Sequence, residues 1–480
     1  TKRKNLVKAL LNKANATQIA LRARLAVLRA QGQVQSFTPL WIINGFALTG
    51  TSAVINELAK APEVDHIDLD ITLQGPTGQT ITTLPPEQNL TLINATSLWD
   101  LGFAGQGVVI ASLDSGVDGA HPDLAPRWRG GSNSWYDPFG QHTTPTDVGG
   151  HGTWTMGIMV GGSNGGTAIG VAPQAQWIAA KIFNDAGIST VSAIHQSFQW
   201  LLDPDGNPAT ADAPDIVNNS WTFGSPGCNL TFQPDLQALL AAEIIPVFAA
   251  GNYGPYAPSD VSPANYPEAF AVGAIDNSNA IYAYSSRGST SCGRTGAVIF
   301  PALVAPGVNV TTSGLLSSYY VDSGTSFAAP HVSGALALLL SAFPNLTVAQ
   351  LENLLITTAV DLGPTGPDNT YGAGRLDVLA AYNAQAQPVS TATPTATSTN
   401  LPDTPTPTDT VAAATATAAD TPAAGATPVP PTDTATATAT PAPPTNTETA
   451  TATATPPPTN TATATATATN TPVPPTATPT

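Results

Sequence analysis

The stretch Gly324-Thr325-Ser326-Phe327-Ala328-Ala329-Pro330-His331 stands directly before the mostly apolar run Val332 to Phe343. A flexible Gly-Thr-Ser segment that opens a helix presents one hydroxyl where backbone N–H groups point outward. This end of a helix favours developing negative charge. The pattern therefore predicts a nucleophilic serine, Ser326, at the start of a helix. Such a serine is active only if a base and an orienting acid lie elsewhere in the chain.

Two further segments supply the acid and the base. Asp114 ends the apolar strand predicted over Val108 to Leu113, and His151 lies in Gly149-Gly150-His151-Gly152-Thr153-Trp154-Thr155. The chain order is Asp, His, Ser, one of the unrelated orders in which this chemistry recurs. Each residue type is common on protein surfaces, and only the joint occurrence indicates nucleophilic catalysis.

Together with Phe248-Ala249-Ala250-Gly251-Asn252, these segments resemble the subtilisin-like serine peptidases (subtilases) over about residues 85 to 385. The resemblance implies a serine endopeptidase with an α/β fold, a parallel sheet sandwiched by helices. It also implies protein or peptide substrates and no cofactor for the chemistry itself.

The same resemblance assigns the catalytic roles. Ser326 would attack the substrate carbonyl, His151 would take and return the proton, and Asp114 would orient His151. The side-chain amide of Asn252 and the Ser326 N–H would stabilise the oxyanion. Of the other acids and histidines, Asp118 and Asp123 are expected to be turn and surface groups. Structural or solvated roles are expected for His121, His142, His195 and His331.

A substrate cleft is predicted beside Asn219-Ser220-Trp221, which is similar to the family's cleft-lining strand. A bound peptide would add an extended strand to exposed backbone there. The sequence departs from the family at Thr222-Phe223, where a Gly is usual, so the first subsites are altered or the loop is longer. The resemblance places the pocket wall at Val261, Ser262 and Pro263, where no decisive charge occurs, so an apolar or broad preference before the scissile bond is expected. The expected substrate-binding residues are Ser220, Trp221, Thr222, Ala250 and Gly251.

Structural calcium occurs in many subtilases, and Asp123 and Asn164 align with ligand positions of some members. Calcium takes six to eight oxygens, and the glycine-rich loop Gly161 to Gly166 supplies few of them. A calcium site and a plain turn both stay open. The pair Cys228 and Cys292 also leaves two interpretations open, a disulfide between loops or two buried thiols.

Residues 1–75 form a first compositional zone, with nine Lys/Arg and five Asp/Glu. The pattern predicts a helix over 5–30, a strand over Thr38–Leu48, a helix over Thr51–Ala59 and a strand over Val64–Thr72. This small α+β arrangement resembles subtilase propeptides, particularly those of bacillopeptidase F-like members. Such a domain would template folding and then inhibit the enzyme with its C-terminal strand. An unrelated N-terminal domain is the alternative.

The middle of the chain divides into a linker and a catalytic domain. Residues 76–91 are rich in Gly, Pro and Thr and are predicted to be the processing region. Residues 92–387 alternate short apolar strands with helical stretches, which predicts a parallel sheet covered on both faces. Residues 76–387 contain six basic and 22 acidic residues, which argues against nucleic-acid binding. The expected strands include 108–113, 176–182, 216–218, 244–249 and 269–275.

Residues 388–480 are almost entirely Thr, Pro and Ala, with no Lys, Arg or aromatic residue. This composition buries too little apolar surface to offset its ordering entropy, so a disordered tether is predicted. A cell-surface spacer and a plain extension both fit. No apolar run reaches membrane-spanning length. The chain begins with Thr1 and shows no signal peptide, so we expect that an upstream leader was removed or lies outside this sequence. Secretion is expected from the resemblance and from the tail.

The sequence thus favours a secreted serine endopeptidase made as an autoprocessing zymogen. A surface scaffold with an inactive peptidase domain is a second hypothesis, and the complete Asp, His, Ser and Asn set argues against it. Acyl transfer to an amine is a third, and nothing in the sequence indicates suppressed hydrolysis.

Overall fold

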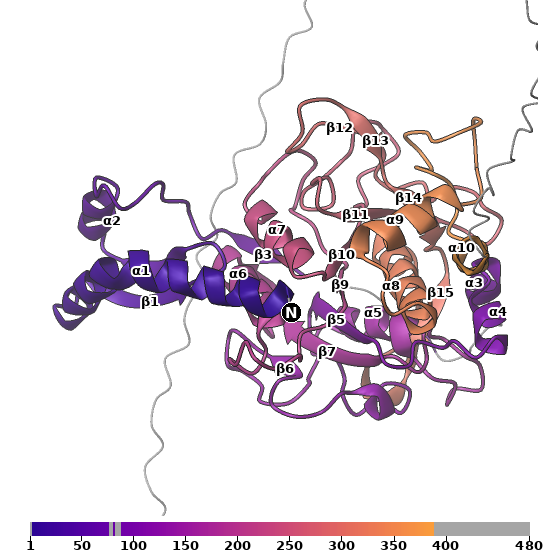
Figure 1. Cartoon of the computed structure of the whole chain (residues 1–480), viewed down its shortest axis with the longest axis horizontal. Coiled ribbons are helices and arrows are strands. Elements are labelled where there is room, and N and C mark those ends of the chain that lie inside the picture. Colours follow the sequence, from indigo (N-terminus) through magenta and orange to yellow (C-terminus); the bar gives the residue numbers. More distant parts are fainter. Residues whose placement is uncertain (1, 76–79, 82–87, 388–480) are drawn as a thin grey trace, which may run out of the picture. The chain divides into compact units, whose positions relative to one another are not determined.

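A computed structural model describes residues 2–75, 80–81 and 88–387 (Figure 1). The predicted tail over 388–480 lies outside the described residues, as does most of the predicted linker over 76–91. The element bounds below refer to the described residues.

The centre of the fold is a seven-stranded sheet in the order β14-β11-β10-β9-β5-β7-β6, and all neighbouring strands run parallel. This confirms the predicted α/β fold with a parallel sheet, and each of the five expected strands is present. The strands are β5 (Val109–Asp114), β6 (Trp135–Tyr136), β7 (Gln176–Lys181), β9 (Ile216–Asn219), β10 (Ile245–Ala249), β11 (Phe270–Ile275) and β14 (Leu303–Pro306).

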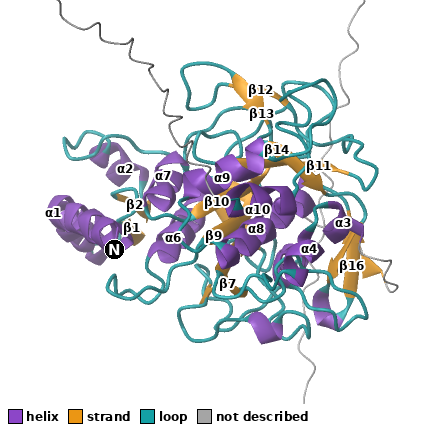
Figure 2. Cartoon of the chain, turned by 45° about the vertical axis from the view of Figure 1, so that its right-hand side comes forward, coloured by secondary structure: helices purple, strands orange, loops and turns teal. Residues whose placement is uncertain are grey.

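Side chains along the strands alternate between two hydrophobic layers, as the pleat of a strand requires. Ile110 and Ile216 belong to the first layer, whereas their neighbours Ala111 and Val217 belong to the second. Helices therefore cover both faces of the sheet (Figure 2). The first layer contains α4 (Ala95–Asp100), α5 (His151–Val160), α8 (Thr325–Ala342), α9 (Val348–Thr357) and α10 (Val378–Ala386), and the second contains α6 (Val191–Leu202) and α7 (Gln233–Ala241).

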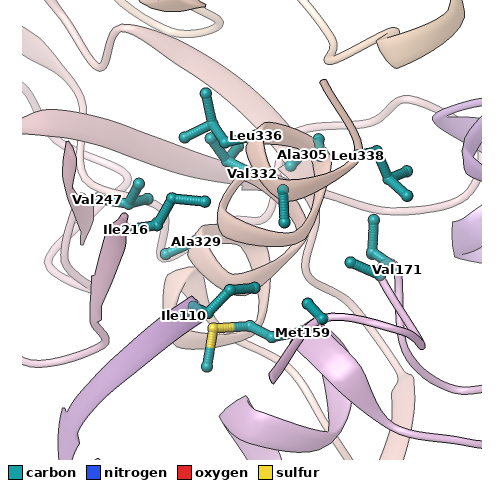
Figure 3. Close-up of a cluster of buried hydrophobic side chains, with 14 of the residues drawn as sticks. Ile110, Met159, Val171, Ile216, Val247, Ala305, Ala329, Val332, Leu336 and Leu338 are labelled. Atoms are coloured by element: carbon teal, nitrogen blue, oxygen red, sulfur yellow. The ribbon is translucent and has the colours of Figure 1, made fainter. Parts of the chain in front are cut away.

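The central helix of the first layer is α8, in which every residue from Thr325 to Leu339 is buried. Its Ala329, Val332 and Leu336 lie among strand side chains such as Val247 (Figure 3). Among the described residues, α8 is also the one helix long and apolar enough to cross a membrane, and 83% of it is buried inside the protein. Packing in the core thus accounts for its hydrophobicity.

The remaining strands form small sheets around the central one. A three-stranded sheet has the order β15-β16-β4, β3 pairs with β8, and β12 pairs with β13. A short helix, α3 (Gln88–Leu92), and two 3₁₀ turns, η1 (Ala125–Arg127) and η2 (Leu315–Ser317), complete the region around the central sheet. The strands are β3 (Thr72–Gln74), β4 (Thr80–Ile81), β8 (Ile188–Thr190), β12 (Gly288–Thr290), β13 (Val298–Phe300), β15 (Val310–Ser313) and β16 (Tyr319–Asp322).

Residues 2–75 begin with α1 (Lys2–Ala30), followed by β1 (Val34–Leu40), β2 (Gly45–Gly50), α2 (Ser52–Leu58) and β3. The single strand predicted over Thr38–Leu48 is wrong. The chain turns before Gly45, where Asn44 adopts a φ of 53°, and β1 and β2 pair as an antiparallel hairpin. The connecting turn is formed by residues 41–44, and Gly45 pairs with Leu40. Asn is one of the non-glycine residues that adopt positive φ most readily.

The strand predicted over Val64–Thr72 is also wrong except at its last residue, where β3 begins. The alternating apolar side chains have no core to enter, because Ile67, Leu69 and Ile71 are exposed. Alternation alone therefore does not produce a strand without a pairing partner.

Cys228 and Cys292 form a disulfide, with their Cα atoms 5.2 Å apart and a sequence separation of 64. The disulfide interpretation of the two cysteines is thus the correct one. The bond joins the loop that follows β9 to the loop that follows β12.

Replacing both cysteines by serine should lower the free energy of unfolding. A closed loop of 64 residues restricts the unfolded chain. Losing this restriction is worth up to about 4 kcal/mol at 25 °C. Guanidinium chloride unfolding of the double variant measures the change. Wild type reduced with dithiothreitol should unfold at the same midpoint as the double variant, and an unchanged midpoint in both would show that the two thiols do not pair in solution.

Candidate active site

The four predicted catalytic residues come from different elements and meet at the carboxyl edge of the sheet. Asp114 ends β5, Asn252 follows β10, His151 opens α5, and Ser326 is the second residue of α8. Strands β5, β9 and β10 are neighbours, and side chains beyond the carboxyl ends of such strands gather at one edge.

His151 is bonded to Asp114 in a buried environment. Its Nδ1 lies 2.8 Å from Oδ1 and 3.0 Å from Oδ2 of the carboxylate. The two side chains are 3% and 1% exposed. Because Nδ1 faces a carboxylate, this nitrogen carries the proton, and Nε2 is the basic nitrogen of the neutral ring. Asp114 Oδ1 also accepts a hydrogen bond from Ser115 N at 2.7 Å, which fixes the carboxylate.

Asp147, which was not predicted, caps the helix that carries His151. Its Oδ1 accepts from Gly150 N at 2.8 Å, and its Oδ2 accepts from Thr153 N at 2.9 Å and from Thr153 Oγ1 at 2.7 Å. A carboxylate at a helix N-terminus satisfies N–H groups that have no partner within the helix. The available signal was an acid four residues before the predicted catalytic histidine.

Pro330 decides how Ser326 is bonded. Proline has no N–H, so the Ser326 carbonyl lacks its usual donor one turn later in the helix. Ser220 Oγ donates to this carbonyl at 2.9 Å, and Ser326 Oγ donates to the Ser220 carbonyl at 3.1 Å. This reciprocal pair ties the start of α8 to the end of β9. Within the described residues, the Ser326 hydroxyl is therefore bonded to Ser220 and not to His151.

Asn252 is oriented by Thr325. Its Oδ1 accepts from Thr325 N at 2.9 Å and from Thr325 Oγ1 at 3.0 Å. Since Oδ1 is held in this way, Nδ2 is the end of the amide left to donate to a ligand. The preceding Gly251 has a φ of 102°, and a Cβ there would lie 2.5 Å from the Val261 side chain, so a glycine is required.

A cavity of about 510 Å³ lies beside Ser326 and Asn252. The side chains and backbone that line it are uncharged. Ala250 is not part of this lining, because it is fully buried and its N–H donates to the Val272 carbonyl. The lining on the catalytic side is Ser220, Trp221, Thr222, Phe223, Gly224, Ala249, Gly251, Asn252, Tyr253, Thr325 and Ser326, and it includes four of the five predicted substrate-binding residues.

The Thr222-Phe223 segment, where the sequence departs from the family, is tied firmly into the cavity wall. Phe223 N donates to the Ser262 carbonyl at 2.9 Å, and the Phe223 ring stacks on Phe232. The Phe223 carbonyl accepts from the Tyr253 hydroxyl at 2.9 Å. The Tyr253 side chain thus connects the loop after β10 to the loop after β9, and both loops line the cavity.

Residues 71–75 line the cavity from the N-terminal zone. Strand β3 pairs antiparallel with β8, and the N–H of the following Gly75 donates to the Gly187 carbonyl at 2.6 Å. Leu73 is 6% exposed and joins the second hydrophobic layer. An extended segment of this chain therefore occupies one side of the cavity.

The two residues considered for calcium are hydrogen-bonded to each other. Asp123 Oδ1 accepts from Asn164 N at 2.7 Å and from Asn164 Nδ2 at 2.9 Å, and its Oδ2 accepts from the Tyr319 hydroxyl at 2.6 Å. Both carboxylate oxygens of Asp123 thus accept hydrogen bonds from within the protein, and a calcium ion at this pair stays a prediction. Asp123 is 2% exposed, so the expectation of a surface group is wrong.

Among the described residues, one group of three carboxylates gathers closely enough to share a cation: Asp203, Asp205 and Asp212. Burial, together with the charges of the other two, raises the pKa of Asp203 to about 6. Mutual repulsion of this kind is expected of neighbouring carboxylates and does not by itself indicate a bound ion.

His331 has a structural role on the nucleophile helix. Its Nδ1 donates to the Phe327 carbonyl at 2.8 Å, and its Nε2 accepts from Asn89 Nδ2 at 2.8 Å. Burial lowers the pKa of His331 to about 4, so the ring is neutral near pH 7. This contact joins α3 to α8. The other histidines of the catalytic part also have partners, since His121 bonds Asp123 N, His142 bonds Asp185, and His195 bonds Asp235.

An oriented histidine, a serine at a helix start and a directed amide at one sheet edge are characteristic of serine hydrolases. Comparison with known proteins shows which family of serine hydrolases this is. The family model described as "Subtilase family" (Peptidase S8) matches residues 105–374, a range that contains Asp114, His151, Asn252 and Ser326. The chain therefore belongs to the subtilase family, the subtilisin-like serine endopeptidases.

Individual relatives support this assignment. Bacillopeptidase F of Bacillus subtilis (strain 168) is 34% identical over 423 residues, which cover 80% of this chain but 29% of that protein. Subtilisin E of the same strain is 32% identical over 71% of this chain and 81% of that protein. Subtilisin Savinase of Lederbergia lenta is 35% identical over 60% of this chain and 96% of that protein. The chain thus spans less than a third of bacillopeptidase F and most of each subtilisin.

Acid should destabilise the protein through His331. Its pKa is about 4 in the folded state. In an unfolded chain the value is about 6.5, so the unfolded state binds more protons between these values. The stabilising contribution is complete above pH 6.5 and is lost as the pH falls toward 4, by about 1.4 kcal/mol per pH unit.

Thermal unfolding at pH 7 and 4.5 tests this in the Ser326→Ala background, which avoids self-digestion. His331→Gln should lose less stability than its parent between the two pH values. Glu352, whose pKa burial raises to about 7, contributes the opposite slope and is common to both proteins, so it cancels in the comparison. Equal pH slopes in the two proteins would contradict the prediction.

Proposed function

We propose that this chain hydrolyses internal peptide bonds through an acyl-enzyme formed on Ser326. The observation that carries the proposal is the bond from His151 Nδ1 to Asp114 at 2.8 Å, which makes His151 Nε2 the base. As Ser326 Oγ attacks the scissile carbonyl carbon, Nε2 takes the hydroxyl proton and then gives it to the leaving amine. Asp114 holds the tautomer and stabilises the imidazolium. A water molecule activated by the same Nε2 then releases the acyl group.

The oxyanion of the tetrahedral intermediate would be bound by Asn252 Nδ2 and the Ser326 N–H. Support comes from the fixed orientation of the Asn252 amide, since Oδ1 is engaged by Thr325. To react, Ser326 Oγ leaves the Ser220 carbonyl and turns toward His151. Catalytic hydrogen bonds often form only once substrate is present.

We also propose that residues 1–75 are an inhibitory propeptide and that the chain processes itself within residues 76–91. In support, residues 71–75 line the cavity beside Ser326. A second contact lies away from the cavity, where Gln199 Oε1 accepts from Trp41 N at 2.7 Å and from Ile42 N at 3.3 Å. A strand that occupies the backbone of β8 competes with any peptide that would bind there.

Secretion is part of the proposal. The Cys228–Cys292 disulfide supports it, because such bonds persist in oxidising compartments outside the cytosol. The substrates would be proteins or peptides, and the uncharged cavity lining favours neutral side chains next to the scissile bond.

Removing the oxyanion donor should lower kcat with little change in KM. For Asn252→Ala we expect a loss of about 10²–10³-fold, the magnitude known for the corresponding asparagine of a subtilisin and taken over from it. Asn252→Asp keeps an oxygen for Thr325 but removes the donor, so it should lose at least as much. Steady-state kinetics on a peptide amide checks both variants. Full activity in Asn252→Asp would exclude this role.

Removing the nucleophile should stop processing. Wild type should lose the N-terminal zone by a cut within residues 76–91, whereas Ser326→Ala should stay whole, because no acyl-enzyme can form. Intact mass over time measures this, and Ser278→Ala on the surface is the matched control. A fluorophosphonate should label wild type and not Ser326→Ala. A wild type that stays whole and remains unlabelled would refute the proposed function.

A further inference from the structure

We propose that Trp154 is a positioning residue for this reaction, holding the His151 ring and the Ser326 segment at a fixed separation through one aromatic stack. The inference rests on the proposed function and adds a residue that sets the geometry between base and nucleophile.

The stack consists of three rings. Trp154 and Tyr320 lie face to face, with centroids 3.8 Å apart and planes 7° apart. Phe327 continues the arrangement, 6.4 Å from Trp154 at 21° and 6.5 Å from Tyr320 at 24°. The imidazole of His151 meets Trp154 edge to face, at 5.6 Å and 67°. The contacts of Trp154 with His151 and with Phe327 have the separations of about 4.5–7 Å that aromatic rings favour. The Trp154–Tyr320 pair is packed more closely, so the rings have little room to rotate.

The three rings come from the segments that carry the catalytic groups. Trp154 follows His151 by one turn of α5, so both side chains lie on the same side of that helix. Phe327 directly follows Ser326 on α8, and Tyr320 lies on β16, which leads into the Ser326 segment. The stack therefore connects the base on one helix to the nucleophile on another.

The surroundings of Trp154 fix its place. The side chain is buried in a small cluster with Ile158 and Val310, separate from the two main layers. Thr312 Oγ1 donates to the Trp154 carbonyl at 2.6 Å. On the other side, a Cβ on Gly150 would lie 3.0–3.2 Å from the indole ring, so the ring rests against the backbone just before His151.

A separate device for setting this distance is needed because base and nucleophile are not bonded to each other. The Ser326 hydroxyl donates to the Ser220 carbonyl, and the His151 bond goes to Asp114. Their separation is therefore set by the packing of α5 against α8. A displacement of about 1 Å at a reacting group can reduce the rate by about 10²-fold, so packing that sets this distance affects kcat.

The test compares two tryptophans that stack on a tyrosine. Trp154→Leu should lower kcat by about 10- to 100-fold, with KM within about twofold, because substrate still binds while the proton transfer is misaligned. Trp154→Phe keeps a ring in the stack and should restore most of the rate. Trp200→Leu is the matched control, since Trp200 stacks on Tyr136 at 5.6 Å and is similarly buried but lies outside the site.

Thermal unfolding separates loss of geometry from loss of stability. Trp154→Leu and Trp200→Leu should both lower the unfolding midpoint, but only Trp154→Leu should lose kcat. If Trp154→Leu does not fold, Phe327→Leu breaks the stack from the nucleophile side and carries the same expectation. In the double variant Trp154→Leu/Phe327→Leu, the fold-loss of kcat should be smaller than the product of the two single fold-losses. Both substitutions disrupt the same aromatic stack, so their effects are not independent.

An equal kcat in Trp154→Leu and Trp200→Leu would overturn the inference, as would a Trp154→Leu variant changed in KM alone. These outcomes leave the proposed function intact, because wild type still processes itself and reacts with the fluorophosphonate. Failure of the proposed function is a separate result, seen when wild type itself neither hydrolyses peptides nor becomes labelled.

Discussion

The burial of α8 against the parallel sheet is the constraint on which the other features depend. A helix satisfies most of its own backbone hydrogen-bonding groups. When its side chains are apolar, removing their surface from water drives the helix into the core. Once Thr325 to Leu339 are enclosed, the start of the helix cannot move independently of the strands. The residue at its second position is then presented at the carboxyl edge of the sheet. The nucleophile is thus placed by the core, and the site needs few contacts of its own to hold it.

Burial alone does not fix the rotation of a helix, because the hydrophobic effect is not directional. A chain of polar contacts supplies that direction. Ser333 Oγ donates to Asn218 Oδ1, Asn218 Nδ2 donates to Ser220 Oγ, and Ser220 Oγ donates to the Ser326 carbonyl. The chain runs from α8 to β9 and back to α8, and Pro330 creates the free carbonyl at its end. A helix turned about its axis would leave these buried groups unpaired, which costs more than an ordinary hydrogen bond contributes.

A structural feature was predictable from the sequence when neighbouring residues in the chain marked it. The strands were predictable because continuous apolar runs between polar loops indicate strands buried on both faces, and Asp114 and Ser326 stood at recognisable ends of such elements. The hairpin was missed because the apolar residues of its turn continue the apolar run over Thr38–Leu48, and only Asn44, with its positive φ, interrupts it. Trp154 could not be recognised, because a tryptophan near a helix start indicates only a core position. Its meaning depends on Tyr320 and Phe327, which lie far away in sequence.

Residues 1–75 are net positive and residues 76–387 are net negative, but the contacts between them depend little on charge. The Lys2–Glu243 pair has side chains 78% and 38% exposed, and exposed pairs of this kind contribute little to stability.

The buried contacts of the N-terminal zone are more extensive. Arg3 lies deeper and donates to the carbonyls of Ala213, Pro214 and Ala242, and burial lowers its pKa. Val7 and Ile42 are almost fully enclosed in the second layer. Backbone pairing and apolar burial therefore hold the N-terminal zone in place more than net charge does. Because such contacts are short-ranged and weakly screened by salt, cutting the chain near the cavity would not release the zone by itself.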